Sequence, residues 1–385
     1  MSSLPPSARS DAPPFIVMDV MAAAADLEAH GRDIIHMEVG QPGAPAPLPA
    51  LEAARAALKH GRLAYTEALG TRTLRERIAR HYGETYNVDV PARRVMVTTG
   101  SSAAFNLIFL SAFDAGARIA LPRPGYPAYR NLLGVLGLEA VEIAAGPDVN
   151  YVLTAEALAK AHAQKPLQGV LIASPANPTG TLTPADELER IISFCRDAGV
   201  RFISDEIYHG LVYQGHAETA AKFSGDVITV NSFSKYYCMA GWRVGWMVLP
   251  DNLLRPAERL SQSLYISVPE ISQIAAQASF EAKEELDRIK LSYQRNRAVL
   301  LDALPKLGFT DLAPADGAFY VYGSIAKWSN DSMAFSKRML EEAGVATTPG
   351  HDFDRVDGAH TLRFSFAGTE EAIAEGVKRL ERWLG

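Results

Sequence analysis

The stretch that decides the fold is 169-GVLIASPANPTGTLTPADELERIISFCRDAGVRFISDEIY-208. Residues 169–173 and 201–204 are short apolar runs of the kind that forms buried strands. Between them, residues 184–198 form an amphipathic helix, and Thr183 is its expected N-cap. A strand, a helix and a second strand in this order predict two parallel strands joined by a crossover helix.

The same alternation continues on both sides of this stretch. Further runs that predict strands lie at residues 95–98, 118–121, 227–230 and 245–249, and a helix is expected at residues 102–112. Strands that alternate with helices predict an α/β fold, with a mostly parallel sheet flanked by helices on both faces. Ligands of such sheets bind beyond the carboxyl ends of the strands, so polar residues that follow strands are the first candidates for a site.

The C-terminal part of the sequence has a different pattern. A long charged helix is expected at residues 283–304, followed by strands at 317–322 and 361–366 and by helices at 332–343 and 369–384. This pattern is typical of a separate α+β layer.

The length of 385 residues also favours more than one domain, at roughly 150 residues per domain. We predict a flexible N-terminal arm at residues 1–14, which are rich in Ser and Pro. Residues 15–45 are expected to join the small domain, residues 46–285 to form a large ligand-binding domain, and residues 286–385 to form a small C-terminal domain.

The composition excludes several classes of function. The 38 Lys and Arg residues against 44 Asp and Glu residues give a net charge of −6, and no basic block marks a surface for nucleic acid or anionic membrane. The two cysteines, Cys195 and Cys238, are too few for a disulfide framework or a cysteine-based zinc site. No apolar run reaches the roughly 18 residues of a spanning helix. We therefore expect a cytoplasmic protein with small-molecule partners and no metal, nucleic acid or membrane.

The segment 231-NSFSKYYCMAGWRVGW-246 follows a predicted strand and carries several reactive groups. Ser232, Ser234 and Arg243 offer hydroxyls and a guanidinium for phosphate oxygens. Lys235 offers an amine that condenses with an aldehyde, so the segment suits a phosphate ester that bears a reactive carbonyl. The letters Ser-Phe-Ser-Lys also match the S-x-x-K motif of penicillin-recognising enzymes, but the K-T-G motif that accompanies it does not occur in the sequence.

Two further strand ends carry polar side chains. Asp205 stands directly after a predicted strand, where a carboxylate can hold a ring nitrogen in its protonated form. Asn177 lies in the rigid turn 174-SPANPTG-180, which can aim its amide into a cleft. Asn177, Asp205, Lys235 and Arg243 occur in this order, and the first three each follow a predicted strand.

In this set of motifs the sequence resembles the fold type I enzymes that depend on pyridoxal 5′-phosphate (PLP), and among them the class I/II aminotransferases of the aspartate aminotransferase type. The resemblance covers residues 15–385. It implies a seven-stranded type of sheet in the large domain and a smaller α+β domain built from the N- and C-terminal segments. It also implies an enzyme that moves an amino group between an L-amino acid and a 2-oxo acid by a ping-pong mechanism.

The resemblance implies roles for individual residues. Lys235 looks like the lysine that forms a Schiff base with the cofactor and then moves the substrate proton. Asp205 looks like the partner of the pyridine nitrogen, and Tyr208 and Asn177 resemble the pair that bonds the phenolic oxygen of the cofactor. Lys235, Asp205 and Tyr208 are therefore the predicted catalytic residues. Tyr126 resembles the aromatic side chain that stacks on the cofactor ring.

The remaining implied roles concern the phosphate and the substrate. Tyr65 resembles the tyrosine that reaches the phosphate of the neighbouring subunit, which implies a homodimer with shared active sites. Gly40, Asn177 and Arg363 resemble the residues that hold the substrate, with Arg363 as a bidentate clamp on its carboxylate. The implied phosphate site combines a helix start with the Lys235 segment and contains Gly100, Ser101, Ser102, Ser232, Ser234 and Arg243.

The type of reaction and the substrate stay open at this point. A β-eliminating lyase that acts on cystathionine or cysteine conjugates is an alternative, since the cofactor chemistry is shared up to the carbanion. Some aspartate-using relatives carry a Lys where this chain has Ser101, which weakens an interpretation as a dicarboxylate-only enzyme. Many relatives have a Gly where this chain has Asp354, so the loop after Gly350 departs from the family pattern.

Aromatic residues near the expected site suit an apolar or aromatic substrate side chain, although aromatic richness more often reflects core packing. The aromatic residues that we expect near the site are Phe15, Tyr65, Tyr126, Tyr265 and Phe319.

Overall fold

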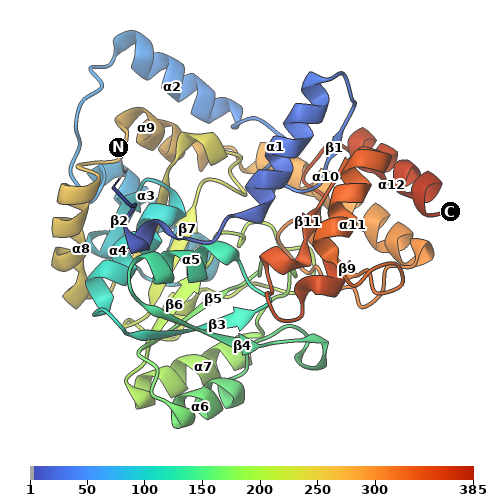
Figure 1. Ribbon diagram of the computed structural model, residues 1–385. Helices are drawn as coiled ribbons and strands as arrows, with labels where there is room; N and C mark the ends of the chain where they lie inside the picture. Colours follow the sequence, from blue (N-terminus) through green and yellow to red (C-terminus); the bar gives the residue numbers. More distant parts are fainter. Residues whose placement is uncertain (1–3) are drawn as a thin grey trace.

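The computed structural model describes residues 4–385, and its centre is a seven-stranded sheet (Figure 1). The strands lie in the order β2-β8-β7-β6-β5-β3-β4. Neighbours pair in parallel, except that β8 runs antiparallel to both β2 and β7. The strands are β2 Val95–Thr98, β3 Arg118–Arg123, β4 Glu139–Ala144, β5 Gly169–Ala173, β6 Arg201–Asp205, β7 Ile228–Ser232 and β8 Gly245–Val248. This confirms the mostly parallel α/β sheet that the sequence predicts.

The six strands predicted for this sheet are present, with small differences at their ends. The seventh strand, β4, was not predicted, because its sequence Glu-Ala-Val-Glu-Ile-Ala mixes charged and apolar residues as a half-exposed edge strand does. The expected N-cap Thr183 is wrong. Helix α7 begins at Ala185 with Pro184 before it, and the Thr183 N–H donates instead to Ser174 Oγ at 2.9 Å.

Helices cover both faces of the sheet because successive strand residues point to opposite sides. Ile203 of β6 packs with Phe109 of α4 in one buried cluster, whereas its neighbour Phe202 packs with Ile191 of α7 in another. The helices around this sheet are α2 Leu48–His60, α3 Arg72–Tyr86, α4 Gly100–Ala112, α5 Pro127–Val135, α6 Ala155–Gln164, α7 Ala185–Ala198, α8 Asp251–Leu264 and α9 Glu270–Ser279.

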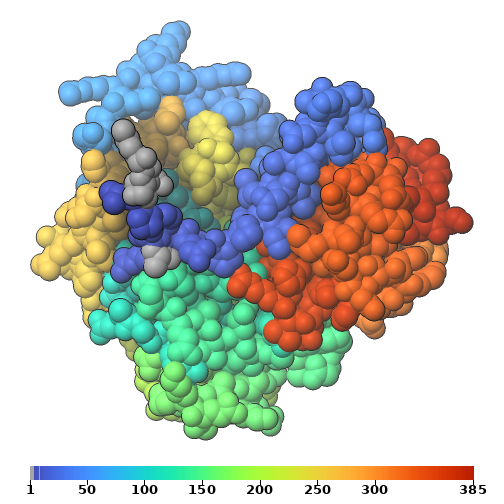
Figure 2. Space-filling view, viewed as in Figure 1, coloured from blue at the N-terminus to red at the C-terminus, as the bar shows by residue number. Residues whose placement is uncertain are grey.

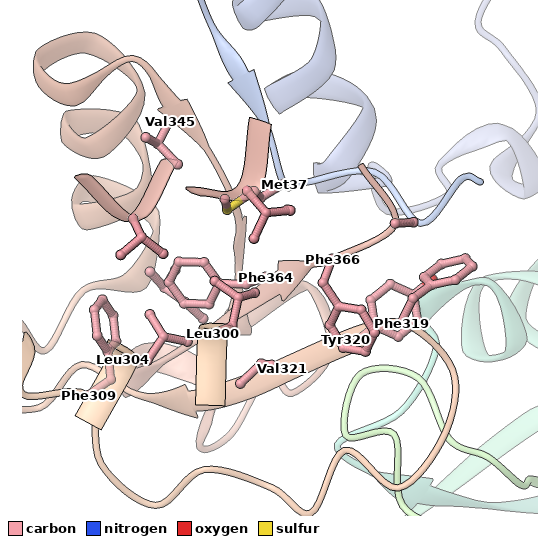
Figure 3. Packing of buried hydrophobic residues seen from close by; sticks show 14 of the residues in the cluster. Met37, Leu300, Leu304, Phe309, Phe319, Tyr320, Val321, Val345, Phe364 and Phe366 are labelled. Carbon is pink, nitrogen blue, oxygen red and sulfur yellow. The ribbon is translucent and has the colours of Figure 1, made fainter. Parts of the chain in front are cut away.

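A second, three-stranded antiparallel sheet has the order β11-β12-β9. Beside it, β1 pairs in parallel with β10, which joins the N-terminal segment to the C-terminal one. Figure 3 shows Met37, which follows β1, in the same buried cluster as Leu300, Phe364 and Phe366. The elements of this part are β1 Ile35–His36, β9 Tyr320–Ser324, β10 Val345–Ala346, β11 Thr348–Pro349, β12 Thr361–Ser365, α10 Lys283–Leu307, α11 Ser332–Arg338 and α12 Glu370–Leu384. Because α10 runs unbroken across residue 285, the domain boundary there stays a prediction.

Helix α1, Ile16–Ala29, lies across the junction of the two parts, and Figure 2 shows it in blue beside the orange C-terminal region. Before it, the predicted arm is described from residue 4 on and is largely exposed, whereas its residues 1–3 lie outside the described part. Across residues 4–385, no helix has both the length and the apolar character for crossing a membrane. The short helices are η1 Ala8–Ser10, η2 Ala92–Arg94, η3 Pro147–Val149, η4 Ala220–Lys222, η5 Ala240–Trp242, η6 Met339–Ala343, η7 Gly350–Asp352 and η8 Gly358–His360.

Candidate active site

The carboxyl ends of the central strands open into one cavity of about 610 Å³. Strand β5 leads into Asn177, β6 ends at Asp205, and β7 leads into Lys235. Because these strands are parallel neighbours, their ends lie at one edge of the sheet. The predicted site residues that line the cavity are Gly40, Ser101, Ser102, Tyr126, Asn177, Asp205, Tyr208, Ser234, Lys235, Arg243 and Arg363.

Three predicted site residues do not line this cavity. Gly100 is the first residue of α4, directly before Ser101. Ser232 lies behind the lining, where its hydroxyl donates to Ser234 Oγ at 2.8 Å. Tyr65 lies away from the cavity, on the segment between α2 and α3, and it is 82% exposed.

The Lys235 amine lies inside the cavity and donates to the carbonyl oxygen of Gly40 at 2.5 Å. Burial lowers the pKa of this amine to about 8, the nearby Arg363 acts in the same direction, and Asp205 opposes both. A lysine of lowered pKa has a substantial neutral fraction near neutral pH, and the neutral amine is the form that attacks a carbonyl carbon.

Asp205 is buried and accepts two hydrogen bonds. Its Oδ1 accepts from the Ile207 N–H at 3.1 Å, and its Oδ2 accepts from the Tyr129 hydroxyl. Burial raises the pKa of Asp205 to about 6, while the bonds from Tyr129 and Ile207 act against that rise. The sequence interpretation missed Tyr129, which lies in the first turn of α5 and shares an edge-to-face contact with Tyr126.

The start of α4 forms a cradle for an anion. Gly100 has a positive φ of 72°, and a Cβ there would lie 2.4 Å from Arg243 Nη2. A Cβ on Gly245 would lie 2.8 Å from the Asn231 carbonyl oxygen and 3.2 Å from the Ser101 nitrogen. The two glycines therefore let a guanidinium and strand β8 approach the positive end of a helix, an arrangement that fits a phosphate group.

Arg363 extends from β12 into the buried side of the cavity. Its Nη1 donates to Asn177 Oδ1 at 2.9 Å, and its Nη2 donates to Thr348 Oγ1 at 3.1 Å and to the Glu38 carbonyl oxygen. Among residues 4–385, its buried Nε has no hydrogen-bond partner. The guanidinium also lies 4.3 Å from the ring centroid of Tyr320. A fixed guanidinium with a free N–H suits recognition of a carboxylate.

Tyr320 lines the same cavity, although the aromatic predicted from this segment was its neighbour Phe319. The Tyr320 hydroxyl lies 2.7 Å from that of Tyr208. A Cβ at residue 40 would lie 1.9 Å from the Tyr320 hydroxyl. The Tyr320 ring can therefore take this position only because residue 40 is Gly. Phe319 does not line the cavity, although the expectation that it lies near the site is confirmed, because its ring centroid is 5.8 Å from Lys235 Nζ.

Part of the cavity lining is an apolar wall. It contains Phe15, Val17 and Met18 together with Val39 from the segment before Gly40. Phe15 lies at the start of α1, and its ring contacts that of Tyr126 edge to face, with 5.7 Å between centroids. Of the other aromatics that were expected near the site, Tyr265 does not line the cavity and belongs with the core cluster around α4.

Comparison with known proteins agrees with this geometry. Residues 32–380 match the family described as aminotransferase class I and II. The chain belongs to this family. It is 47% identical to the valine–pyruvate aminotransferase of Mycobacterium tuberculosis, over 98% of this chain and 97% of that protein.

Solved structures of other aminotransferases also resemble this one. A crystal structure of an aminotransferase from Mycobacterium tuberculosis has a TM-score of 0.97 at 47% identity, over 99% of both chains. Aspartate aminotransferase from Thermus thermophilus, solved with maleate, has a TM-score of 0.93 at 28% identity, over 99% of this chain and 100% of that one.

The protein is therefore an aminotransferase, an enzyme that transfers amino groups and has PLP as its cofactor. The comparisons give no support to the alternative of a β-eliminating lyase. The phosphate cradle and the buried amine of Lys235 fit this cofactor, which has a phosphate and an aldehyde. In the described part of the chain, residues 4–385, no group of three or more His, Cys, Asp or Glu side chains is placed to hold a metal ion.

Proposed function

We propose that this aminotransferase acts on an apolar amino acid with one carboxylate, such as valine, and uses pyruvate as an acceptor. The observation that carries the proposal is the pairing of one buried clamp, Arg363, with an apolar wall of Phe15, Val17 and Met18. The relative in Mycobacterium tuberculosis that is named for valine and pyruvate supports the same substrate class.

The cations of the cavity support a substrate with a single carboxylate. Three cationic side chains line it, namely Lys235, Arg243 and Arg363. Lys235 is the nucleophile of the proposal and Arg243 belongs to the phosphate cradle, so Arg363 alone is left for the substrate. A second carboxylate in this cavity would lose its hydration without gaining a cation from this chain.

The proposed catalytic roles follow from the positions of the side chains. PLP, when bound, supplies an aldehyde that joins covalently to amines and a pyridine ring that accepts electrons. Lys235 would hold the cofactor through its aldehyde, and its amine, once the substrate amine has replaced it there, would take the proton from the substrate Cα. The Asp205 carboxylate, oriented by Tyr129 and the Ile207 N–H, holds a proton at the ring nitrogen. Arg363 orients the substrate through its carboxylate.

Tyr208 and Asn177 are proposed to bond the phenolic oxygen of the cofactor, and Tyr126 to stack on its ring. These roles are supported by their common position on the cavity wall. Asn177 also connects the two sides of the site, because its Oδ1 accepts from Arg363 at 2.9 Å. Gly40 is proposed to close over the substrate carboxylate with its backbone.

We also propose a homodimer in which Tyr65 reaches the phosphate site of the partner subunit. Support comes from apolar side chains that stay exposed on and near the Tyr65 segment. That segment is held to residues near α9, since the Ala64 N–H donates to Glu270 Oε2 at 2.7 Å and the Thr66 N–H to Ser267 Oγ at 3.3 Å. The exposed apolar residues are Leu48, Leu58, Leu63, Tyr65, Leu264 and Ile266. A second copy of the chain would cover them. A cytoplasmic location stays a prediction.

A panel of amino donors tests this proposal. We expect the purified enzyme, loaded with PLP, to produce alanine from valine and pyruvate with a kcat/KM at least about tenfold above that for aspartate, because one carboxylate of aspartate finds no cation here. Equal or higher kcat/KM with aspartate would contradict the substrate class. Pyruvate and ammonia from cystathionine, formed without any oxo acid, would instead favour the lyase.

A further inference from the structure

The loop after β11, residues 350–357, contacts three segments that carry or adjoin residues of the cavity. The ring centroid of Phe353 lies 4.7 Å from the Arg363 guanidinium. Asp352 Oδ1 accepts from the Ile16 N–H, at the start of α1, at 3.2 Å. The Phe353 carbonyl oxygen accepts from the Gly125 N–H, next to Tyr126, at 3.1 Å. The position of this loop therefore affects the clamp, the apolar wall and the turn that carries Tyr126.

One partly buried ion pair connects the loop to the seven-stranded sheet. Arg123, the last residue of β3, places its Nη1 2.8 Å from Asp354 Oδ1. The two side chains are only 12% and 6% exposed. Neither Arg123 nor Asp354 has a part in the catalytic roles proposed above, so the pair calls for an explanation of its own.

A second carboxylate on the same guanidinium provides an internal comparison. Asp357 Oδ2 also lies 2.8 Å from Arg123 Nη1, but its side chain is 70% exposed. Water and salt screen the exposed pair with Asp357, so loss of the Asp354 charge would leave Arg123 with only a weak, screened partner. The two aspartates therefore lie at the same distance from Arg123, but we expect substitution of Asp354 to affect the loop more than substitution of Asp357.

We propose that Arg123 and Asp354 are positioning residues for the amino-acid substrate: their ion pair keeps the loop of residues 350–357 in place and thereby keeps Arg363 and Phe15 in the arrangement that binds substrate. The proposal rests on the substrate side that Arg363 defines above. If the loop leaves this position for part of the time, the apparent affinity for substrate falls by the fraction of enzyme that is competent to bind. The phosphate cradle and Lys235 belong to other segments of the chain, so we expect PLP binding to change little.

The substitution Asp354→Asn tests the pair with little change to the loop itself. Asp354 Oδ1 also accepts from the N–H groups of Val356 and Asp357, both at 2.9 Å, and the asparagine oxygen can keep these bonds. We expect KM for the amino donor to rise about tenfold, with kcat and the dissociation constant of PLP within about twofold of the parent. Asp357→Asn is the matched control, and its KM is expected to stay within about twofold.

Substitution of the other partner and a readout without turnover complete the test. Arg123→Gln should raise KM as much as Asp354→Asn, and the double variant should raise it no further. In hydrogen exchange of the holoenzyme, peptides that contain Ile16 and Gly125 should exchange faster in Asp354→Asn than in Asp357→Asn. If Asp354→Asn does not fold, Arg123→Gln, which changes the partner on the seven-stranded sheet, is compared with Asp357→Asn instead.

Equal KM and equal exchange in the Asp354 and Asp357 variants would overturn the proposal. A purely structural role would instead lower the thermal midpoint and kcat together, without a selective rise in KM, and would overturn it as well. If the assignment of valine and pyruvate fails, the unmodified enzyme will prefer another amino donor. The KM values of the variants are then compared with that donor in the same way.

Discussion

The cofactor side and the substrate side of the cavity are built in different ways. On the cofactor side, Asn177, Asp205 and Lys235 each lie at the end of one of three adjacent parallel strands. On the substrate side, Phe15 and Arg363 come from opposite ends of the chain and meet because β1 pairs with β10 and the loop of residues 350–357 contacts α1. The proposed cofactor side thus belongs to one continuous sheet, whereas the proposed substrate side combines several separate segments.

The two sides of the cavity also differ in how fully their polar groups are hydrogen-bonded within the chain. Both carboxylate oxygens of Asp205 have donors, and the Lys235 amine has an acceptor. Arg363 keeps a buried Nε without a partner in the described chain. The comparison teaches that changes on the cofactor side should affect PLP binding and kcat, while changes on the substrate side should affect KM.

The largest effect is expected for Lys235→Ala, which removes both the nucleophile and the base from the cofactor side. We expect kcat to fall by at least about 10⁴-fold, the upper range for loss of a general base. Lys337→Ala, at an exposed lysine of α11, is the control and should keep full activity. Borohydride reduction followed by peptide mapping locates the attachment point. A reduced PLP adduct on a different lysine would refute the assignment of the cofactor side.

A pH dependence is expected next. The pKa of Lys235 is lowered from 10.5 to about 8, so the neutral amine is scarce at pH 6 and makes up about half of the population at pH 8. The rate at which the apoenzyme takes up PLP covalently should therefore rise roughly 50-fold from pH 6 to pH 8 and level off above that. Stopped-flow absorbance measures it, and a rate that is flat over this range would show that the amine is not the titrating group.

Arg363→Met tests the substrate side. Loss of a charge-assisted pair with the substrate carboxylate, worth about 1.5–3 kcal/mol, should raise KM for valine by roughly 10- to 100-fold, while the dissociation constant of PLP stays within about twofold. Because Arg363 helps to lower the pKa of Lys235, the uptake profile of the variant should also move to higher pH. Equal losses of PLP and substrate affinity would mean that the two sides do not act separately.

The smallest effect is expected for Tyr65→Phe. If Tyr65 donates to the phosphate in the partner subunit, loss of one hydrogen bond of about 1 kcal/mol should weaken PLP binding about fivefold and leave KM for valine unchanged. Tyr151→Phe, at a half-buried tyrosine away from the cavity, is the control. Sedimentation should show a dimer for both variants, and a monomeric parent protein would contradict the shared site.

Sequence analysis reached much of the cofactor side because each of its residues is marked by a local signal. A buried strand followed by Asp, Asn or Lys is visible within a dozen residues, and the order of strands in a parallel sheet places those ends together. Tyr129 was missed for the opposite reason. Its hydroxyl reaches Asp205 across the fold, and as the third residue of α5 it has no local pattern that separates it from a core tyrosine.

The substrate side was harder to derive. The sequence interpretation named Phe319, whose ring centroid does lie 5.8 Å from Lys235 Nζ, but it missed Tyr320, which lines the cavity. A strand that is apolar on both faces has no alternation from which its orientation can be inferred, and a shift by one residue exchanges the two faces. β9 is buried along its whole length, so only its pairing with β12 shows which side chain points to the cavity.

By itself, the sequence determined the α/β class, the strand ends and the resemblance that connects Lys235 with PLP, because these depend on residue types within short segments. Only the tertiary structure decided that Arg363 is hydrogen-bonded to Asn177, that the Tyr320 hydroxyl requires the space left by Gly40, and that Asp354 forms an ion pair with Arg123. Such contacts join residues that are far apart along the chain, and their geometry depends on how two sheets pack, which no local pattern of residues encodes.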